Sequence, residues 1–206
     1  MYTLHFSPGS CSLVVHAVLE ELNIPFELKK ADTKAPGYRA KVNAKGKVPA
    51  LETPKGVLTE CVAILEHLCD QHEGRLLGKP GTWERARTLE RVATLATEIH
   101  PLFNRFFHED DFSPVKEVQA GVKARGTEKL LAWFREQDAA LRKPYWSGDT
   151  LDASDFYFMV MARWGRWLTP PANEMPNIRP FYERMVSRPS VMKAMQREGI
   201  RPFGTV

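Results

Sequence analysis

Cysteine is scarce in this sequence of 206 residues, with only three present. An odd and low number argues against a disulfide framework and favours a reducing compartment. No apolar run approaches the roughly 20 residues that a membrane helix needs. The first residues also lack the basic segment and long apolar segment of a secretory signal. We therefore expect a cytoplasmic protein with no membrane segment.

The sequence also lacks internal repeats, low-complexity segments and any spacing typical of metal ligands, so we expect no metal site. Its formal net charge of +4 favours anionic ligands. Lysine and arginine are scattered and form no basic block, so nucleic acid is a weak alternative partner and we expect none. The length suffices for one large domain or two small ones.

The strongest local signal is the segment SPGSCSL at residues 7–13. The alternation of apolar and polar residues at 2–6 predicts a strand before it. The broad apolar face of residues 13–22 predicts a helix after it. Cys11 would then lie at the helix start, where free N–H groups and the helix dipole favour an ionised, reactive thiol. A buried, unreactive cysteine is the commoner alternative.

The next residues extend this pattern into a small sheet. Residues 26–29 alternate and predict a second strand, which makes a parallel βαβ unit with the first strand and helix. Residues 32–47 are polar, with proline and glycine, and predict a loop with a short helix. Turn chemistry at residues 53–56 predicts a hairpin, and a helix begins near Cys61. This order of elements indicates a compact α/β sandwich.

Three pieces of this half resemble the thioredoxin-like domain of glutathione S-transferases: residues 7–13, NAKGKVPAL at 43–51 and LTECVAI at 58–64. The first piece resembles the bacterial beta class, in which a cysteine stands where other classes use tyrosine or serine. The resemblance extends over nearly the whole chain. It implies an α/β thioredoxin-like N-terminal domain at residues 1–78, which binds glutathione. An all-α domain at residues 82–206 would form the electrophile pocket.

The resemblance implies a glutathione site centred on Cys11. In the family the peptide bond before the proline matching Pro49 is cis, and the residue matching Val48 offers its backbone to glutathione as an added strand would. The acidic residue matching Glu60 accepts from the γ-glutamyl ammonium group. The helix that starts at Cys61 receives the γ-glutamyl carboxylate on its N–H groups.

One position and one loop of this half depart from the family pattern. Many relatives have serine where Cys61 stands, so a backbone N–H is kept but a hydroxyl donor is lost. A small residue that starts a helix is the favoured interpretation of Cys61, with a redox role as the alternative. The loop at residues 32–43 is shorter than in beta-class relatives, and Lys34 is the nearest match to a lysine that touches glutathione there.

In the second half, glycine and proline at residues 73–81 predict a linker, and a long helical pattern covers residues 83–107. His100 lies on the apolar face of that pattern, where a histidine is usually a satisfied core residue. Here it coincides with the place where beta-class enzymes carry an active-site histidine. Thr97 matches a small hydroxyl residue that touches glutathione in the family.

Pro101 stands where the family commonly has lysine. It should remove a helix hydrogen bond, bend the helix near His100 and take a cation away from the glutathione site. Farther along, Asp152 with Asp155 predicts a capping box before a buried helix at residues 156–168.

Within that buried helix, Trp164 matches a position that lines the electrophile pocket in relatives. The resemblance thus implies a homodimeric enzyme that transfers glutathione, its co-substrate, to hydrophobic electrophiles, with Cys11 and His100 as catalytic residues. A cysteine site also favours thiol–disulfide chemistry. The alternative is a protein of the same fold that binds glutathione or hydrophobic ligands without catalysis.

Overall fold

The computed structural model describes residues 1–203. Its N-terminal part is built around a four-stranded sheet. The strands are β1 (Tyr2–Phe6), β2 (Phe26–Lys30), β3 (Ala50–Thr53) and β4 (Gly56–Thr59). Their order is β2-β1-β3-β4, with β1 and β2 parallel and the other two pairs antiparallel. The predicted βαβ unit and hairpin are therefore present.

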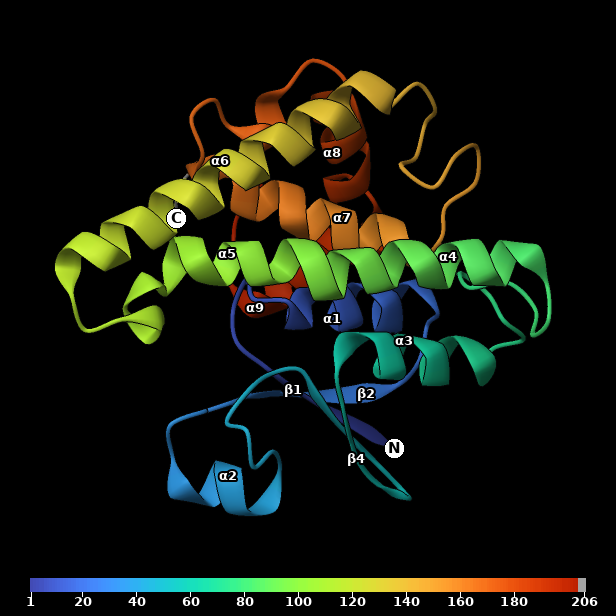
Figure 1. Ribbon diagram of the computed structural model, residues 1–206. Coiled ribbons are helices and arrows are strands. Elements are labelled where there is room, and N and C mark those ends of the chain that lie inside the picture. Colours follow the sequence, from blue (N-terminus) through green and yellow to red (C-terminus); the bar gives the residue numbers. More distant parts are fainter. Residues whose placement is uncertain (204–206) are drawn as a thin grey trace.

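Three helices belong to this part: α1 (Ser12–Glu21), α2 (Pro36–Lys41) and α3 (Cys61–Asp70). Helices α1 and α3 lie between the sheet and the rest of the chain, and α2 lies beyond the opposite side of the sheet (Figure 1). Residues 12–20 of α1 are all buried because α1 contacts β1 and α3 as well as the later helices α7 (Ala153–Trp164) and α9 (Pro189–Glu198). This is the thioredoxin-like arrangement that the sequence predicts.

The second part is helical. Its α-helices are α4 (Trp83–Thr94), α5 (His100–Phe107), α6 (Lys116–Ala140), α7 (Ala153–Trp164), α8 (Ile178–Val186) and α9 (Pro189–Glu198). Helix α7 is buried from residue 153 to 163, in agreement with its apolar sequence, although it ends at Trp164 and not at residue 168. Within residues 1–203, no helix combines the length and apolar character needed to cross a membrane.

The long helical pattern at residues 83–107 is interrupted by a π-helical segment, Leu95–Ile99, between α4 and α5. The backbone N–H of His100 donates to the carbonyl of Leu95, five residues earlier. Pro101 has no N–H to continue the α-helical pattern at the next position. The expected disturbance near His100 therefore takes the form of a wide π turn, a feature often found at functional sites.

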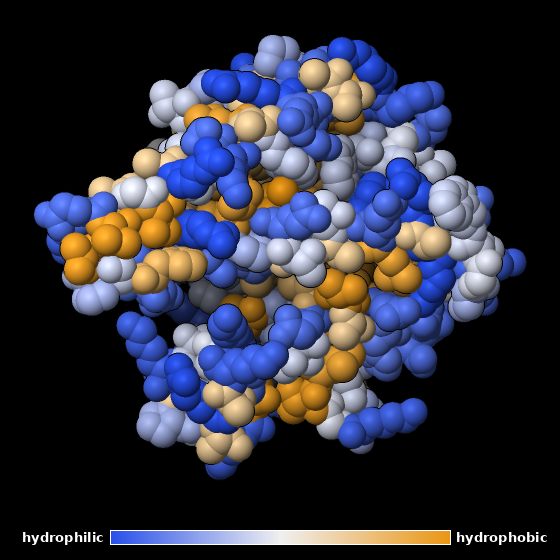
Figure 2. All heavy atoms as spheres, viewed as in Figure 1, coloured by the Kyte–Doolittle hydropathy of each residue, from blue (hydrophilic) through white to orange (hydrophobic). Residues whose placement is uncertain are grey.

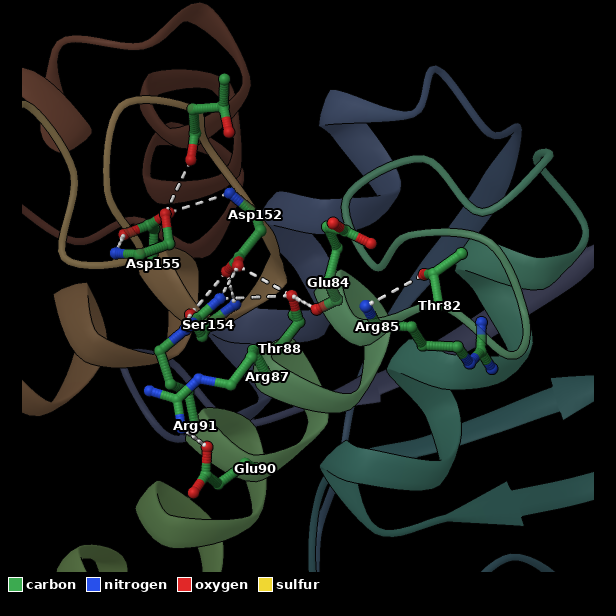
Figure 3. A network of polar contacts seen from close by, with 12 residues as sticks. Thr82, Glu84, Arg85, Arg87, Thr88, Glu90, Arg91, Asp152, Ser154 and Asp155 are labelled. Carbon is green, nitrogen blue, oxygen red and sulfur yellow. Dashed lines mark hydrogen bonds and ion pairs between the residues drawn. The ribbon is translucent and has the colours of Figure 1, made fainter.

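Helix α7 begins with the predicted capping box, which also ties it to α4 (Figure 3). Asp155 accepts a hydrogen bond from the N–H of Asp152 at 2.8 Å. The Asp152 carboxylate caps the helix and accepts a hydrogen bond from Thr88 at 2.9 Å. It also forms an ion pair with Arg91. Thr82 caps α4 by accepting a hydrogen bond from the N–H of Arg85 at 3.3 Å.

We predict that Asp152→Ala lowers the free energy of unfolding by about 2–3 kcal/mol, because it removes a helix cap and leaves a partly buried charged network without its acceptor. Urea denaturation followed by circular dichroism measures this change. Asp149→Ala is the matched control, since Asp149 lies in the same loop and pairs with Lys143, with both side chains exposed. Equal midpoints for the two variants would contradict the role of Asp152.

Candidate active site

A cavity of about 780 Å³ lies where the sheet-bearing part meets the helices. The predicted site residues that line it are Cys11, Val48, Pro49, Glu60, Cys61, His100 and Trp164. Figure 2 shows this face hollowed between the helices and the sheet-bearing part, on the side where α5 and α2 lie in Figure 1. The cavity therefore brings together residues that are more than 150 positions apart in the sequence.

Cys11 directly precedes α1 and is 8% exposed. Its Sγ donates a hydrogen bond to the carbonyl oxygen of Val48 at 3.3 Å. The Val48–Pro49 peptide bond is cis, as the resemblance implies. The pairing of β3 with both of its neighbours begins at Ala50, so Val48 lies just outside the paired strand. The thiol thus faces a short stretch of extended backbone to which a peptide-like ligand could add.

The loop before α1 is held by side chains from α7 and α9. The N–H of Gly9 donates to Oε2 of Glu198 at 2.8 Å, and Nε1 of Trp164 donates to the Gly9 carbonyl at 2.8 Å. Gly9 has φ +66°, and a Cβ at this position would lie 2.8 Å from Nη1 of Arg163. Glu198 is itself held at 2.9 Å from Nδ1 of the buried His16. These contacts hold the loop in place two residues before Cys11 and so help to orient the Cys11 side chain.

Beside Cys11 in the cavity, α3 begins without a side-chain cap. Glu60, the residue before it, has φ +72°, a strained conformation for a residue with a Cβ. The first N–H groups of α3 are then available to an anion. The Glu60 carboxylate lies 2.8 Å from Nζ of Lys45, and both side chains are exposed. An ammonium group and a carboxylate of one ligand would therefore find opposite charges here.

Two hydrogen bonds hold the segment that leads to Val48. Tyr38 and Asn43 both donate to the backbone carbonyl of Lys47, each at 2.8 Å. Lys45 and Lys47 line the cavity together with Asn43. Burial raises the pKa of Tyr38, so its hydroxyl keeps the proton that it donates.

His100 faces the cavity from the start of α5. Its Nδ1 lies 3.0 Å from the hydroxyl of Tyr157, and its ring meets the ring of Trp164 edge to face at 5.0 Å between centroids. Burial, with a smaller contribution from the charge of Lys47, lowers the pKa of His100 to about 4. Burial also raises the pKa of Tyr157. At neutral pH the imidazole is therefore uncharged and can accept a proton.

Aromatic side chains form one wall of the cavity. Trp164 meets Phe103 and Phe107 edge to face, at 5.4 Å and 6.1 Å between ring centroids. Phe107 and Phe112 also line the cavity, and both are partly exposed. The cavity therefore has a charged end near Glu60 and an apolar end near Trp164, which suits a polar peptide beside an apolar molecule.

Two predicted glutathione-binding residues are not among the described residues that line the cavity. Lys34 is exposed in a turn in which its N–H donates to Asp32 Oδ1 at 3.2 Å. Thr97 is exposed, and its hydroxyl donates to the carbonyl of Ala93 at 2.9 Å. Thr97 lies within the π segment, where residues three apart no longer share a face as they do in an α-helix.

Sequence reasoning missed the lysines that do line the cavity, Lys45 and Lys47, although both stand within the motif quoted for the Pro49 segment. It also missed Tyr157. A signal for Tyr157 was available, since it lies seven residues before Trp164 and so on the same face of α7.

The comparisons with known proteins agree with this geometry. Residues 2–76 match the family model for the glutathione S-transferase N-terminal domain. Glutathione S-transferase GstA of Escherichia coli O157:H7 is 34% identical over 96% of this chain and 99% of its own. The chain belongs to the glutathione S-transferase family. It is thus an enzyme, a glutathione transferase, and it is similar to the bacterial beta class.

Solved structures place the family in the same architecture. A bacterial beta-class glutathione S-transferase from Sphingomonas chungbukensis superposes with a TM-score of 0.81 at 31% identity, over 97% of this chain and 100% of that chain. A sphingomonad glutathione S-transferase complexed with glutathione gives 0.80 at 29% identity, over 97% and 100%. The predicted fold class is therefore confirmed.

We predict that His100 makes stability depend on pH between 6.5 and about 4. In this window the unfolded chain binds a proton that the folded state does not, so stability falls as pH falls. One pKa unit is worth about 1.4 kcal/mol, and partial exposure of the ring reduces the full effect to about 2 kcal/mol.

Chemical denaturation of the wild type and of His100→Gln at pH 7 and pH 4.5 measures this loss, which should be smaller in the variant. His108→Gln, at an exposed histidine, is the control and should lose as much as the wild type. An equal loss in all three proteins would contradict the assignment.

Proposed function

We propose that glutathione lies across the cavity with its sulfur beside Cys11. The hydrogen bond from Cys11 Sγ to the Val48 carbonyl carries this proposal, because it puts the thiol next to the backbone that would bind the cysteinyl residue. The γ-glutamyl carboxylate meets the N–H groups at the start of α3, and the ammonium group meets Glu60. Pro49 shapes the backbone segment next to Val48, between the binding points of the cysteinyl and γ-glutamyl residues.

Cys11 has two uses in this arrangement. It donates to the sulfur of bound glutathione and so stabilises the thiolate that attacks an electrophile. As a thiolate it also attacks glutathione disulfide, which gives a Cys11–glutathione mixed disulfide and releases one glutathione thiolate. The start of α1 favours both anionic forms of sulfur, since the helix dipole points its positive end there.

His100 and Trp164 serve the other substrate. The uncharged imidazole accepts a proton from the thiol or returns one to the product, and Tyr157 holds the ring in place. Trp164, with Phe107 and Phe112, supplies an apolar surface for a hydrophobic electrophile. The fold does not select the electrophile, because many reactions share this architecture.

The family resemblance also supports a proposal for the location, oligomeric state, biological role and domain division of the protein. We infer a cytoplasmic homodimer that acts in detoxification, with residues 1–78 as the glutathione-binding domain and residues 82–206 as the domain of the electrophile pocket. Size-exclusion chromatography with light scattering tests the dimer, and a mass equal to one chain at micromolar concentration would contradict it.

We predict that Cys11→Ser lowers glutathione-dependent disulfide reduction by at least about 100-fold, because serine cannot form the mixed disulfide. Conjugation should also fall, since the hydroxyl is a weaker stabiliser of a neighbouring thiolate. Steady-state rates with a chromogenic electrophile and with a mixed disulfide substrate measure both. Unchanged rates in both assays would refute the catalytic role of Cys11, and a failure to bind immobilised glutathione would favour a non-catalytic protein.

We predict that Glu60→Gln raises the KM for glutathione by roughly 10-fold, because a hydrogen bond to a charged group is worth about 1.5–3 kcal/mol. The change keeps the shape of the side chain and removes the charge that would pair with the ammonium group. Initial rates at varied glutathione concentration measure the effect. Glu73→Gln, at an exposed position with a similar positive φ outside the cavity, is the control, and an equal KM in both variants would contradict the role of Glu60.

A further inference from the structure

Two of the three cysteines converge at the same point of the cavity. Cys11 precedes α1 and Cys61 is the first residue of α3, so the two helix starts meet here. The Sγ of Cys61 donates to the backbone carbonyl of Cys11 at 3.7 Å. Both residues line the cavity and both are free thiols, 8% and 7% exposed.

We propose that Cys61 is a resolving thiol that displaces glutathione from Cys11 and forms an intramolecular Cys11–Cys61 disulfide. This inference depends on the mixed disulfide of the proposed function and adds a dithiol step to it. Its basis is the contact between the two residues and their shared access to the cavity. Cys61 Sγ already lies against the Cys11 backbone, and the disulfide requires the Cys11 side chain to exchange its contact with the Val48 carbonyl for one with Cys61 Sγ.

The step balances without another reactant. The Cys61 thiol gives its proton to solvent or to a base, and its thiolate attacks Cys11 Sγ in the mixed disulfide. The Cys11–glutathione S–S bond breaks, the Cys11–Cys61 bond forms, and glutathione leaves as a thiolate. Two further glutathione molecules reduce the new disulfide and leave as glutathione disulfide, which restores both thiols.

The charges favour this order of events. The pKa of the Cys61 thiol is raised well above its usual value, and the Cys11 side chain is the largest cause. Cys61 therefore keeps its proton while the free Cys11 side chain lies beside it. When Cys11 enters a neutral mixed disulfide, its thiol is consumed and no longer raises the pKa of Cys61. Burial and the charge of Glu60 remain as the opposing effects.

Cys69 shows what a structural thiol looks like in this protein. It lies eight residues farther along α3, is fully buried, and is not among the described residues that line the cavity. Burial raises its pKa to about 12, with a smaller contribution from Asp70. Cys69 therefore provides a matched control, because it is a free thiol on the same helix as Cys61 but lies away from the cavity that holds Cys11.

To test this inference, the reduced protein is mixed with glutathione disulfide and quenched with acid at successive times. Intact mass spectrometry then detects the adduct, and peptide mapping locates it. In the wild type and in Cys69→Ala, the glutathione adduct on Cys11 should be brief and give way to a Cys11–Cys61 cross-linked peptide. In Cys61→Ser the adduct should persist, with a lifetime at least about tenfold longer. Cys61→Ala is a second variant should the first fail to fold.

Each outcome decides between the two proposals. An adduct that persists equally in the wild type and in Cys61→Ser would overturn the resolving role and leave the proposed function intact. If no adduct forms on Cys11 even in the Cys61 variants, the mixed-disulfide chemistry itself is wrong. A cross-link from Cys11 to Cys69 would also overturn the inference. A Cys11–Cys61 cross-link in the wild type, absent from Cys11→Ser, would support it.

Discussion

The Gly9 peptide unit joins the two parts of the site. Its N–H is held by Glu198 of α9 and its carbonyl by Trp164 of α7, which lie 189 and 155 residues away in the sequence. Cys11 follows two residues later, so its position depends on helices of the second part. The burial of α1 against α7 and α9 brings these partners to the loop. The helical part therefore positions the thiol as well as supplying the apolar wall.

Features that depend on near neighbours could be predicted from the sequence. The alternation in β1, the hairpin of β3 and β4, and the capping box of Asp152 each involve residues within a few positions of one another. The placement of Cys11 at a helix start followed from β1 and α1 in the same way. The family motifs added the cis bond at Pro49, which no local pattern of this sequence establishes.

Features that depend on distant partners could not be predicted. Nothing near Gly9 indicates that Glu198 and His16 meet beside it. Whether Lys34 or Lys45 lines the cavity depends on the path of the loop between them. The hydrogen bond from Tyr38 to the carbonyl of Lys47 holds that path. Matching loop residues by their position in the sequence does not show which lysine faces the cavity. Thr97 was predicted from the resemblance alone, and in the π segment its exposed hydroxyl donates to the carbonyl of Ala93.

Two departures from the family pattern concern different groups of glutathione in the site that we propose. Pro101 removes a cation from the α5 side, but Lys45 and Lys47 line the cavity and keep positive charge within it. At Cys61 the change concerns the side chain alone, because the proposed anion site would consist of backbone N–H groups that any residue except proline provides. Position 61 can therefore carry serine or cysteine at little cost to anion binding. A cysteine here adds a second thiol beside Cys11, and the dithiol step that we propose depends on this one side chain, whereas the fold and the proposed anion site do not.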